Sequence, residues 1–321
     1  MSAHTRPRLM VVSGNSNPQL GQEIANYLGV ELGRVKLSQF SNGEIYVKFL
    51  ESVRGADVFI IQTLCKPVNT HLMELLVMID ALKRASAERI SAVIPHYGYA
   101  RQDKKTTARE PITAKLIADL LTVAGMDRML SMDLHAGQIQ GFFDLPVDHL
   151  TSLPVLTGYF MEKNIKDFVV VSPDVGRVKL AKKFADKLGA QLAILHKTRP
   201  AHNVVEVGQV IGEVQGKTAL LVDDMIDTAG TITEGAKTLI KSGAKKVYAA
   251  ATHPVLSGPA IERINESPIE ELVVTNTMPV PRLDELPKLK VLSIAQIFAQ
   301  TILNVYEDES VSAIFEEDNF I

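Results

Sequence analysis

The sequence predicts an α/β protein made of two similar domains, each a mainly parallel sheet flanked by helices. Short runs rich in β-branched residues alternate with segments that carry apolar residues at helical spacing and end in glycine. The chain also repeats itself, because Gly125 matches Gly243 and His135 matches His253 at the same separation. Strands that alternate with helices in this way favour parallel sheets covered on both faces.

A series of apolar runs is expected to form buried strands. In chain order they are residues 8–14, 56–64, 89–96, 128–135, 167–174, 191–197, 218–224, 246–253 and 271–276. Helical spacing is clearest in residues 111–125, 174–189 and 231–243, each of which ends in glycine. The segment 35–50 differs, because polar and apolar residues alternate around Asn42-Gly43, which predicts a β-hairpin in the first domain.

The chain length suits two domains of roughly 150 residues each. The segment 145–154 is punctuated by prolines, so we place the boundary there. The expected domains are residues 1–150 and 151–300, and residues 301–321 form an acidic tail docked on them. Only the second half keeps the strand-end carboxylates described below, which predicts one active site per chain.

Composition narrows the classes of function. A net charge of -3 gives the whole protein no attraction to nucleic acid or to an anionic membrane, so anion recognition must be local. The single cysteine excludes an internal disulfide framework and fits a reducing compartment. No apolar run is long enough for a membrane span. We therefore expect a cytoplasmic protein without nucleic-acid or membrane partners.

The stretch 218–246 carries the clearest functional signal. Asp223 and Asp224 end a strand, and the small residues Thr228 to Thr231 then open a helix. Backbone N–H groups at such a helix start suit a phosphate, and open α/β sheets bind ligands at this edge. The carboxylates cannot share that phosphate, so they should face hydroxyls or a metal. A sugar phosphate with a vicinal diol meets both requirements.

Other interpretations of the same stretch remain open. Asp227 or Thr231 could be a simple helix N-cap, and Asp223 and Asp224 could be solvated residues at a strand end. The "DTAG" sequence also occurs in GTPase switch regions, but the nearest phosphate-loop match, "IGEVQGKT", has Ile211 where that motif needs glycine. The sugar-phosphate site is the interpretation we favour.

The segment "LLVDDMIDTAGTI" closely resembles the phosphoribosyl diphosphate signature of type I phosphoribosyltransferases and ribose-phosphate diphosphokinases. The segments "FSNGEIYVKFLESVRGADVFIIQ", "YARQDKK", "SMDLHAGQIQGFF", "VVSPDVG" and "HKTRP" are similar to the class I ribose-phosphate diphosphokinase (PRPP synthetase) family and span nearly the whole chain. The resemblance implies two phosphoribosyltransferase-type domains. It also implies a transferase that moves the diphosphoryl group of ATP to the 1-hydroxyl of ribose 5-phosphate. The products would be PRPP and AMP, with PRPP feeding nucleotide, histidine and tryptophan biosynthesis.

The resemblance assigns substrate and catalytic residues. Asp223 and Asp224 would hold the ribose hydroxyls, while the 5-phosphate would be held by Asp227, Thr228, Ala229, Gly230 and Thr231. Lys197 and Arg199 would be catalytic, and Arg199 would also contact ribose 5-phosphate. They follow a strand and precede a proline-containing loop, which suits a mobile lid, although a solvated basic loop is the plain alternative.

The resemblance also assigns nucleotide, metal and regulatory residues. The ATP residues would be Phe40, stacked on adenine, with Asn42, Gly43, Glu44, Arg101 and Gln102. His135 and Asp174 would bind Mg²⁺, although Mg²⁺ prefers oxygen ligands, and the plain alternatives are a strand-end histidine and an N-cap aspartate. Inorganic phosphate would activate and ADP inhibit through Ser52, Arg54, Ser310 and Ser312. The hairpin would reach a neighbouring subunit, in a homohexamer built from dimers.

Overall fold

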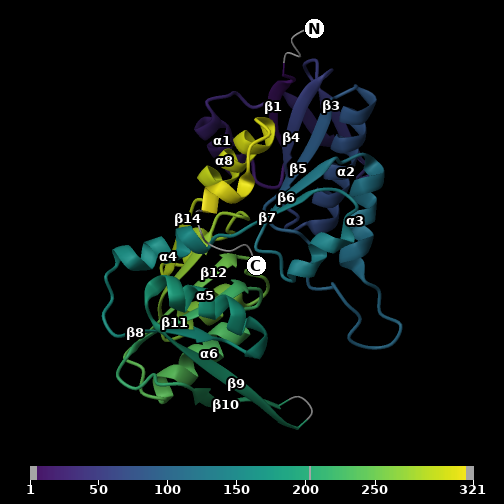
Figure 1. Ribbon diagram of the computed structural model, residues 1–321. Helices are drawn as coiled ribbons and strands as arrows, with labels where there is room; N and C mark the ends of the chain where they lie inside the picture. Colours follow the sequence, from purple (N-terminus) through teal and green to yellow (C-terminus); the bar gives the residue numbers. More distant parts are fainter. Residues whose placement is uncertain (1–5, 202–203, 316–321) are drawn as a thin grey trace. The chain divides into compact units, whose positions relative to one another are not determined.

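The computed structural model describes residues 6–201 and 204–315, and the side chains of residues 197–208 and 315 lie outside its described part. The chain divides into two compact units, one made of Met1–Leu150 with Ser293–Ile321 and the other of Thr151–Leu292 (Figure 1). This division differs from the expected domain limits, because residues 293–321 belong to the first unit. The physical reason is a helix near the end of the chain that packs on the first sheet.

The first unit is built on a five-stranded parallel sheet. Its order is β1 (Arg8–Ser13), β4 (Ala56–Ile61), β5 (Arg89–Ile94), β6 (Arg128–Met132) and β7 (Val147–Leu150). Every residue of β4 is buried, including Asp57, and its otherwise apolar sequence predicts a strand covered on both faces. Strand β7 was not expected, because "VDHL" is short and of mixed polarity.

Helices cover both faces of the first sheet, and successive residues of β4 show how. Val58 and Ile60 face the cluster of α2 (Val68–Arg84), α3 (Thr113–Ala124) and η1 (Gly137–Phe142). Phe59 and Ile61 face the cluster of α1 (Pro18–Leu28) and α8 (Ala295–Tyr306), which is followed by η4 (Val311–Phe315). Because successive side chains of a strand point to opposite faces, alternate residues of β4 belong to two different hydrophobic cores.

The predicted hairpin is present as β2 (Val35–Gln39) and β3 (Ile45–Phe49), an antiparallel pair. Leu37, Val47 and Phe49 pack against the core beside α2, so one side of the hairpin is anchored. Gly43 has a φ of 91°, which a residue with a side chain rarely adopts, and this explains the glycine at the turn.

The second unit is built on a seven-stranded sheet. Its order is β10 (Val204–Ile211), β9 (Gln191–Ala201), β8 (Phe168–Ser172), β11 (Thr218–Met225), β12 (Lys246–His253), β13 (Ile269–Thr275) and β14 (Leu289–Leu292). Only the β9–β10 pair is antiparallel among these described strands. The edge strands β10 and β14 were not expected, and β11 lies at the centre between β8 and β12.

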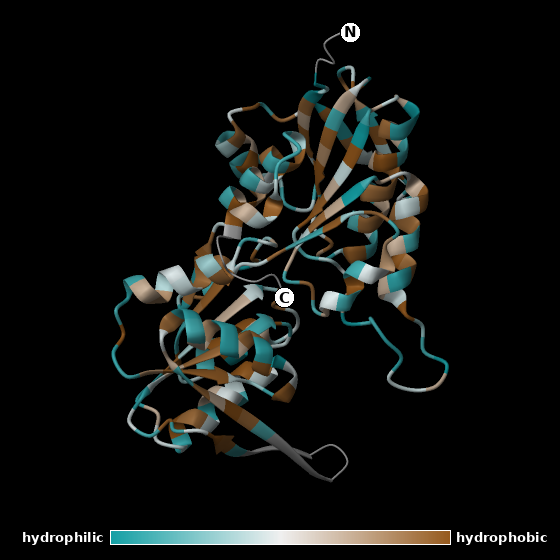
Figure 2. Ribbon diagram, in the orientation of Figure 1, coloured by the Kyte–Doolittle hydropathy of each residue, from teal (hydrophilic) through white to brown (hydrophobic). Residues whose placement is uncertain are grey.

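Helices cover both faces of this sheet as well. One face packs on α6 (Gly230–Lys241) and α7 (Ala260–Glu266), and the other on α4 (Leu153–Glu162) and α5 (Val178–Leu188). Short helical turns η2 (Val175–Arg177) and η3 (Leu283–Glu285) complete the unit. Hydrophobic colouring runs along the strands and also marks the helices, whereas α5 presents a largely hydrophilic face (Figure 2). Within the described residues, no helix has the length and apolar character needed to cross a membrane.

Candidate active site

The carboxyl end of β11 carries the adjacent carboxylates. The strand residues Thr218 to Val222 are buried, and the parallel neighbours β8 and β12 hold β11 at the centre of the sheet. The side chain of Asp223 is 17% exposed and that of Asp224 is 6% exposed. The solvated strand-end interpretation is therefore wrong for both residues.

A tight turn leads from these carboxylates into α6. Ala229 has a φ of 59°, so a small residue in the left-handed region reverses the chain immediately before Gly230 begins the helix. Thr228 and Thr231 are exposed, whereas Ala229 is buried. Because Ala229 offers no capping oxygen, the first N–H groups of α6 have the geometry of an anion site.

Two side chains from neighbouring segments brace this turn, and sequence reasoning missed both. Arg263 of α7 donates from Nη1 to the carbonyl oxygen of Thr228 at 3.0 Å. The Ser257 hydroxyl donates to Oδ1 of Asp227, and the Ser257 amide donates to the Asp227 carbonyl at 3.0 Å. Asp227 thus holds its own turn in place.

Burial and the nearby guanidinium of Arg177 shift the pKa of Asp223 in opposite directions. Burial raises the pKa of Asp223 well above its usual value of 3.8, and the neighbouring Asp224 raises it further. Arg177, which lies against both carboxylates, opposes that rise in pKa. Sequence reasoning missed Arg177 because a lone arginine near a helix start is usually a solvated residue.

Asp174 follows β8, and β8 pairs in parallel with β11, so both strands deliver acidic residues to one edge of the sheet. Oδ1 of Asp174 accepts from the Arg177 amide at 3.2 Å, so the N-cap interpretation holds for this residue. This hydrogen bond does not test metal binding. The carboxylates of Asp174, Asp223 and Asp224 are oxygen donors of the kind that Mg²⁺ prefers, and Mg²⁺ commonly uses one or two carboxylates together with substrate phosphates.

His135 lies three residues beyond β6 and belongs to the first unit, whereas Asp174 belongs to the second. Across residues 6–196 and 209–314, no group of three or more His, Cys, Asp or Glu side chains is arranged to hold a metal ion by itself. A protein-only metal cage is therefore absent from that part of the chain. The magnesium assignment stays a prediction.

The hairpin tip carries the predicted nucleotide residues. The Phe40 amide donates to the Glu44 carbonyl at 2.8 Å, and the Gly43 amide donates to the Phe40 carbonyl at 2.8 Å. Oδ1 of Asn42 accepts from the Glu44 amide at 3.2 Å. The Phe40 ring is 56% exposed, with its edge-to-face partner Tyr46 at 5.6 Å. A hydrogen-bonded turn thus presents an exposed aromatic side chain.

The other predicted nucleotide residues, Arg101 and Gln102, lie in the segment between β5 and α3. Gln102 is fixed by its own backbone, which donates to the Tyr99 carbonyl at 2.9 Å and accepts from the Ala114 amide at 3.2 Å. Thr113 also donates to Oε1 of Gln102 at 2.5 Å. The segment is therefore tied to the start of α3 at Gln102.

The predicted catalytic side chains of Lys197 and Arg199 lie outside the described residues. Their backbone belongs to β9, which runs to Ala201 and pairs Lys197 with Val207 of β10. The expectation that the strand ends at residue 197 and a loop follows is therefore wrong. Strand β10, which was not predicted from the sequence, pairs with β9 in this region.

The predicted regulatory residues all belong to the first unit. The Ser52 carbonyl accepts from Nη2 of Arg8 at 2.5 Å, and Nη1 of Arg54 donates to the Ser86 hydroxyl at 3.5 Å. The hydroxyls of Ser310 and Ser312 lie 2.7 Å apart, in the segment after α8. These contacts do not test a regulatory role.

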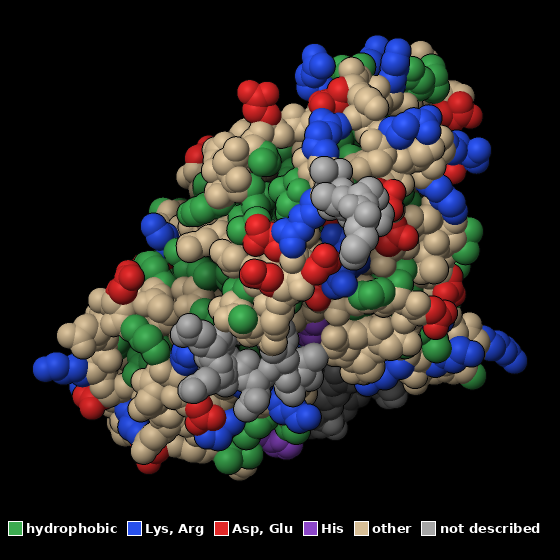
Figure 3. Space-filling view, turned by 45° about the horizontal axis from the view of Figure 1, so that its top comes forward, with side chains coloured by type: hydrophobic (Ala, Val, Ile, Leu, Met, Phe, Trp, Pro, Cys, Tyr) green, Lys and Arg blue, Asp and Glu red, His purple; other side chains and the backbone are tan. Residues whose placement is uncertain are grey.

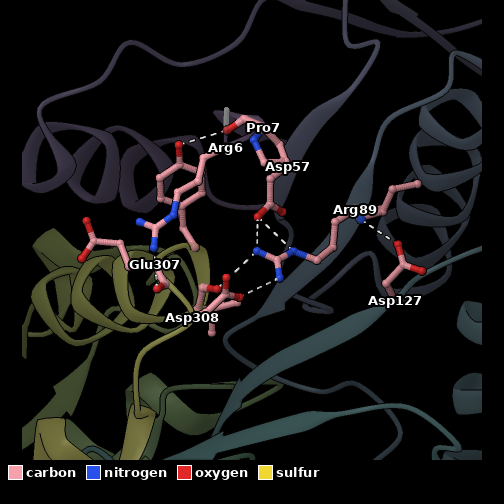
Figure 4. Close-up of polar contacts among 10 residues, drawn as sticks. Arg6, Pro7, Asp57, Arg89, Asp127, Glu307 and Asp308 are labelled. Carbon is pink, nitrogen blue, oxygen red and sulfur yellow. Dashed lines mark hydrogen bonds and ion pairs between the residues drawn. The ribbon is translucent and has the colours of Figure 1, made fainter. Parts of the chain in front are cut away.

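An ion-pair cluster ties the end of α8 to the first sheet (Figure 4). Nε of Arg89 donates to Oδ2 of the fully buried Asp57 at 3.0 Å, and Nη1 of Arg89 lies 3.4 Å from Oδ1 of Asp308. Burial raises the pKa of Asp57, and Arg89 opposes that rise. Arg6 donates to the Glu307 carbonyl at 2.9 Å, so the first described residue meets the segment that directly follows α8.

The net charge of -3 gives the protein no strong overall field. Lys, Arg, Asp and Glu side chains are interspersed on the face shown in Figure 3. Recognition of an anion therefore depends on local groups such as the start of α6.

The two helix-flanked sheets and the carboxylate turn before α6 define an α/β protein with phosphoribosyltransferase-type domains. Comparison with known proteins gives the family. Residues 9–125 match the family model described as the N-terminal domain of ribose phosphate pyrophosphokinase, and residues 206–316 match that of the phosphoribosyl synthetase-associated domain.

Relatives that match nearly the full length of the chain belong to the same family. A ribose-phosphate pyrophosphokinase of Bacillus subtilis (strain 168) is 55% identical over 307 residues, covering 96% of this chain and 97% of that protein. One of Caldanaerobacter subterraneus subsp. tengcongensis is 58% identical over 308 residues, covering 96% and 98%. The crystal structure of phosphoribosylpyrophosphate synthetase from Mycobacterium smegmatis matches with a TM-score of 0.89 and 51% identity, covering 94% of this chain and 99% of that one. The chain belongs to the ribose-phosphate pyrophosphokinase family, which confirms the resemblance and the fold class predicted from the motifs.

Proposed function

We propose that the chain transfers the diphosphoryl group of ATP to the 1-hydroxyl of ribose 5-phosphate and releases PRPP and AMP. The observation that carries this proposal is the turn from Asp223 and Asp224 into α6. It combines an anion site at a helix start with two carboxylates directly before it. A ligand with a phosphate at one end and neighbouring hydroxyls at the other satisfies both groups.

In this reaction the turn binds and orients the sugar. The backbone from Thr228 to Thr231 donates N–H groups to the 5-phosphate, and Asp223 and Asp224 accept hydrogen bonds from the ribose hydroxyls. The 1-hydroxyl then attacks the β-phosphorus of ATP in line, and AMP leaves. Positioning and charge neutralisation dominate such a transfer, because little covalent work falls to the protein.

The nucleotide is held by the hairpin tip and by the segment before α3. Phe40 stacks on adenine, with Asn42, Gly43, Glu44, Arg101 and Gln102 around the nucleotide. The exposed ring of Phe40 and the hydrogen-bonded tip support this assignment. Lys197 and Arg199 donate to oxygens on which negative charge develops, and Arg199 also contacts ribose 5-phosphate.

Asp174 of the second unit and His135 of the first are each proposed as ligands for Mg²⁺, which would supply charge neutralisation to the diphosphate. The oxygen donor of Asp174 suits that ion, and its place on the sheet edge beside β11 supports the assignment.

Assembly, regulation and location complete the proposal. The chain forms a homo-oligomer, a hexamer built from dimers, in which the hairpin reaches a neighbouring subunit. Inorganic phosphate activates the enzyme and ADP inhibits it through Ser52, Arg54, Ser310 and Ser312. The reaction takes place in the cytoplasm, where a buried thiol such as Cys65, whose pKa burial raises to about 11, stays reduced.

The test is to incubate the protein with ATP, Mg²⁺ and ribose 5-phosphate and to quantify AMP and PRPP. We expect equal amounts of both products. A phosphoribosyltransferase would instead consume supplied PRPP with a nucleobase and form no AMP. A non-catalytic binding homologue would do neither, so either result contradicts the proposal.

A further inference from the structure

Arg177 contacts both carboxylates of the candidate sugar site. Its Nε lies 3.3 Å from Oδ1 of Asp223, and its Nη2 lies 3.0 Å from Oδ1 of Asp224. The Arg177 side chain is only 20% exposed, and both aspartates are more buried still. The three groups therefore form a largely buried charge cluster at the carboxyl end of the second sheet.

The η2 turn holds the backbone of Arg177 in place. It ends the η2 turn that follows β8, and its amide donates to Oδ1 of Asp174 at 3.2 Å. The Ser172 hydroxyl donates to the Asp174 carbonyl at 2.6 Å, which holds the same turn from the strand side. Because β8 and β11 are parallel neighbours, this turn lies beside the end of β11, and the guanidinium reaches the carboxylates from there.

The carboxylates need that cation for the role proposed above. Two adjacent carboxylates withdrawn from water repel each other, and a cation close to both reduces that repulsion and holds them in one arrangement. A planar guanidinium can serve two carboxylates at once, whereas the ammonium of lysine acts as a point charge.

Hydrogen bonding within the pair gives the cluster a defined orientation. The Asp224 amide donates to Oδ1 of Asp223 at 2.8 Å, and the Nε of Arg177 approaches this same Oδ1. The oxygen atoms fixed by the backbone and by the guanidinium are Oδ1 of both residues. Arg177 therefore sets which side of each carboxylate is turned toward the protein.

We propose that Arg177 is a positioning residue of the ribose subsite, which orients Asp223 and Asp224 to accept the sugar hydroxyls. This inference rests on the proposed function. It adds a residue that acts on the sugar through the two carboxylates, without itself touching the reacting atoms.

The competing interpretation is a structural ion pair that only stabilises the fold. A structural pair predicts a lower melting temperature and similar losses for both substrates when Arg177 is replaced. A positioning role predicts a selective loss for the sugar, because the nucleotide residues belong to other segments. The ratio of the two KM changes therefore separates the interpretations.

The experiment measures steady-state AMP formation by the full-length enzyme with Arg177→Gln and Arg177→Lys. For Arg177→Gln we expect KM for ribose 5-phosphate to rise about tenfold to a hundredfold, as for loss of charge-assisted hydrogen bonds, with KM for ATP within about twofold. Arg177→Lys should recover part of the loss, because it restores the charge without the fork. If Arg177→Gln does not fold, Arg177→Lys decides: a raised sugar KM supports the inference, and wild-type values for both substrates overturn it.

A matched control and a double mutant sharpen the result. Lys163→Gln breaks another half-buried ion pair of the same unit, with Glu271 at 3.1 Å, and should leave both KM values unchanged. In an Asp223→Asn background, Arg177→Gln should raise the sugar KM much less than in the wild type, because the two residues act together. Additive effects, or equal losses for ATP and sugar, overturn the inference. Wild-type enzyme that forms no AMP would instead contradict the proposed function itself.

Discussion

The Tyr97 hydroxyl donates to the Ala114 carbonyl oxygen at 2.9 Å, and this hydrogen bond joins the two ends of the segment that carries Arg101 and Gln102. The Tyr97 ring is buried in the core beside α2 and α3, with Phe143 edge-to-face at 5.9 Å. Burial raises the pKa of Tyr97, so the hydroxyl stays protonated as a donor. A core residue thus connects the packing of the first unit to the predicted nucleotide contacts.

We expect Tyr97→Phe to raise KM for ATP by several-fold while KM for ribose 5-phosphate stays within about twofold. Removing the hydroxyl costs about 0.5 to 1.5 kcal/mol of unfolding free energy, since one neutral hydrogen bond is lost and the ring remains. The measurement combines substrate titrations with a denaturant melt. An unchanged KM for ATP would show that the hydrogen bond serves the fold alone.

Asp223→Asn or Asp224→Asn should impair use of ribose 5-phosphate more than binding of ATP. A lost charge-assisted hydrogen bond is worth about 1.5 to 3 kcal/mol, or roughly a tenfold to hundredfold change in KM for the sugar. Steady-state kinetics with each substrate varied in turn will measure this. Equal losses for the two substrates would argue against placing the carboxylates at the ribose hydroxyls.

Lys197→Ala and Arg199→Ala should leave a folded protein that binds ATP but forms AMP at least a hundredfold more slowly. Donors placed where negative charge develops are each worth about 10² to 10³ in rate. Arg199→Lys should not restore full activity, because a point charge does not reproduce the planar fork on phosphate oxygens. AMP formation, a thermal melt and an ATP titration are needed together. Near wild-type turnover in Lys197→Ala would remove its catalytic role.

The raised pKa of Asp223 predicts a specific pH dependence of stability. Because the folded pKa lies above the usual 3.8, the folded state holds this proton more tightly than the unfolded state does. Its contribution to stability is therefore complete below about pH 3.8 and is lost as the pH rises through the folded pKa. The stability of wild type relative to Asp223→Asn should fall from pH 4 towards neutrality. Melts of both proteins across that range test the sign, and a rising difference would contradict it.

The regulatory assignment leads to a further expectation. Arg54→Ala should weaken the dependence of activity on inorganic phosphate and leave KM for ribose 5-phosphate unchanged, because Arg54 and the sugar turn belong to different units of the fold. A titration with phosphate at saturating substrates measures the effect. Ser86→Ala, which removes the hydroxyl that Arg54 contacts at 3.5 Å, is the matched control and should change the titration little. Identical phosphate curves for wild type and Arg54→Ala would exclude the assignment.

Sequence reasoning worked best where local chemistry dictates structure. The apolar runs became buried strands because their residues suit a sheet covered on both faces, and Asn42-Gly43 became a hairpin turn because Gly43 readily adopts a positive φ. The carboxylate turn could also be found, since adjacent acidic residues after an apolar strand are unusual. The short or mixed strands β7, β10 and β14 could not be found, because their polarity alone does not indicate burial.

Residues whose role depends on a partner far away along the chain could not be predicted from the sequence. Arg177 and Arg263 look like ordinary charged residues near helices, and only the fold shows that one meets Asp223 and the other meets the Thr228 carbonyl. The placement of α8 was missed for the same reason. The helix itself was not among the predicted elements, and nothing local indicated which sheet Phe298 would cover.

The return of α8 to the first sheet has a consequence for how the protein is made. Residues 151–292 form an uninterrupted unit, so they can complete their core while the chain is still emerging from the ribosome. The first unit cannot, because one face of its sheet, including Phe59 and Leu130, is covered by Phe298 and Ile302 near the end of the described chain. The half that is synthesised first therefore finishes folding last, and until then it exposes an apolar face that favours aggregation and chaperone binding.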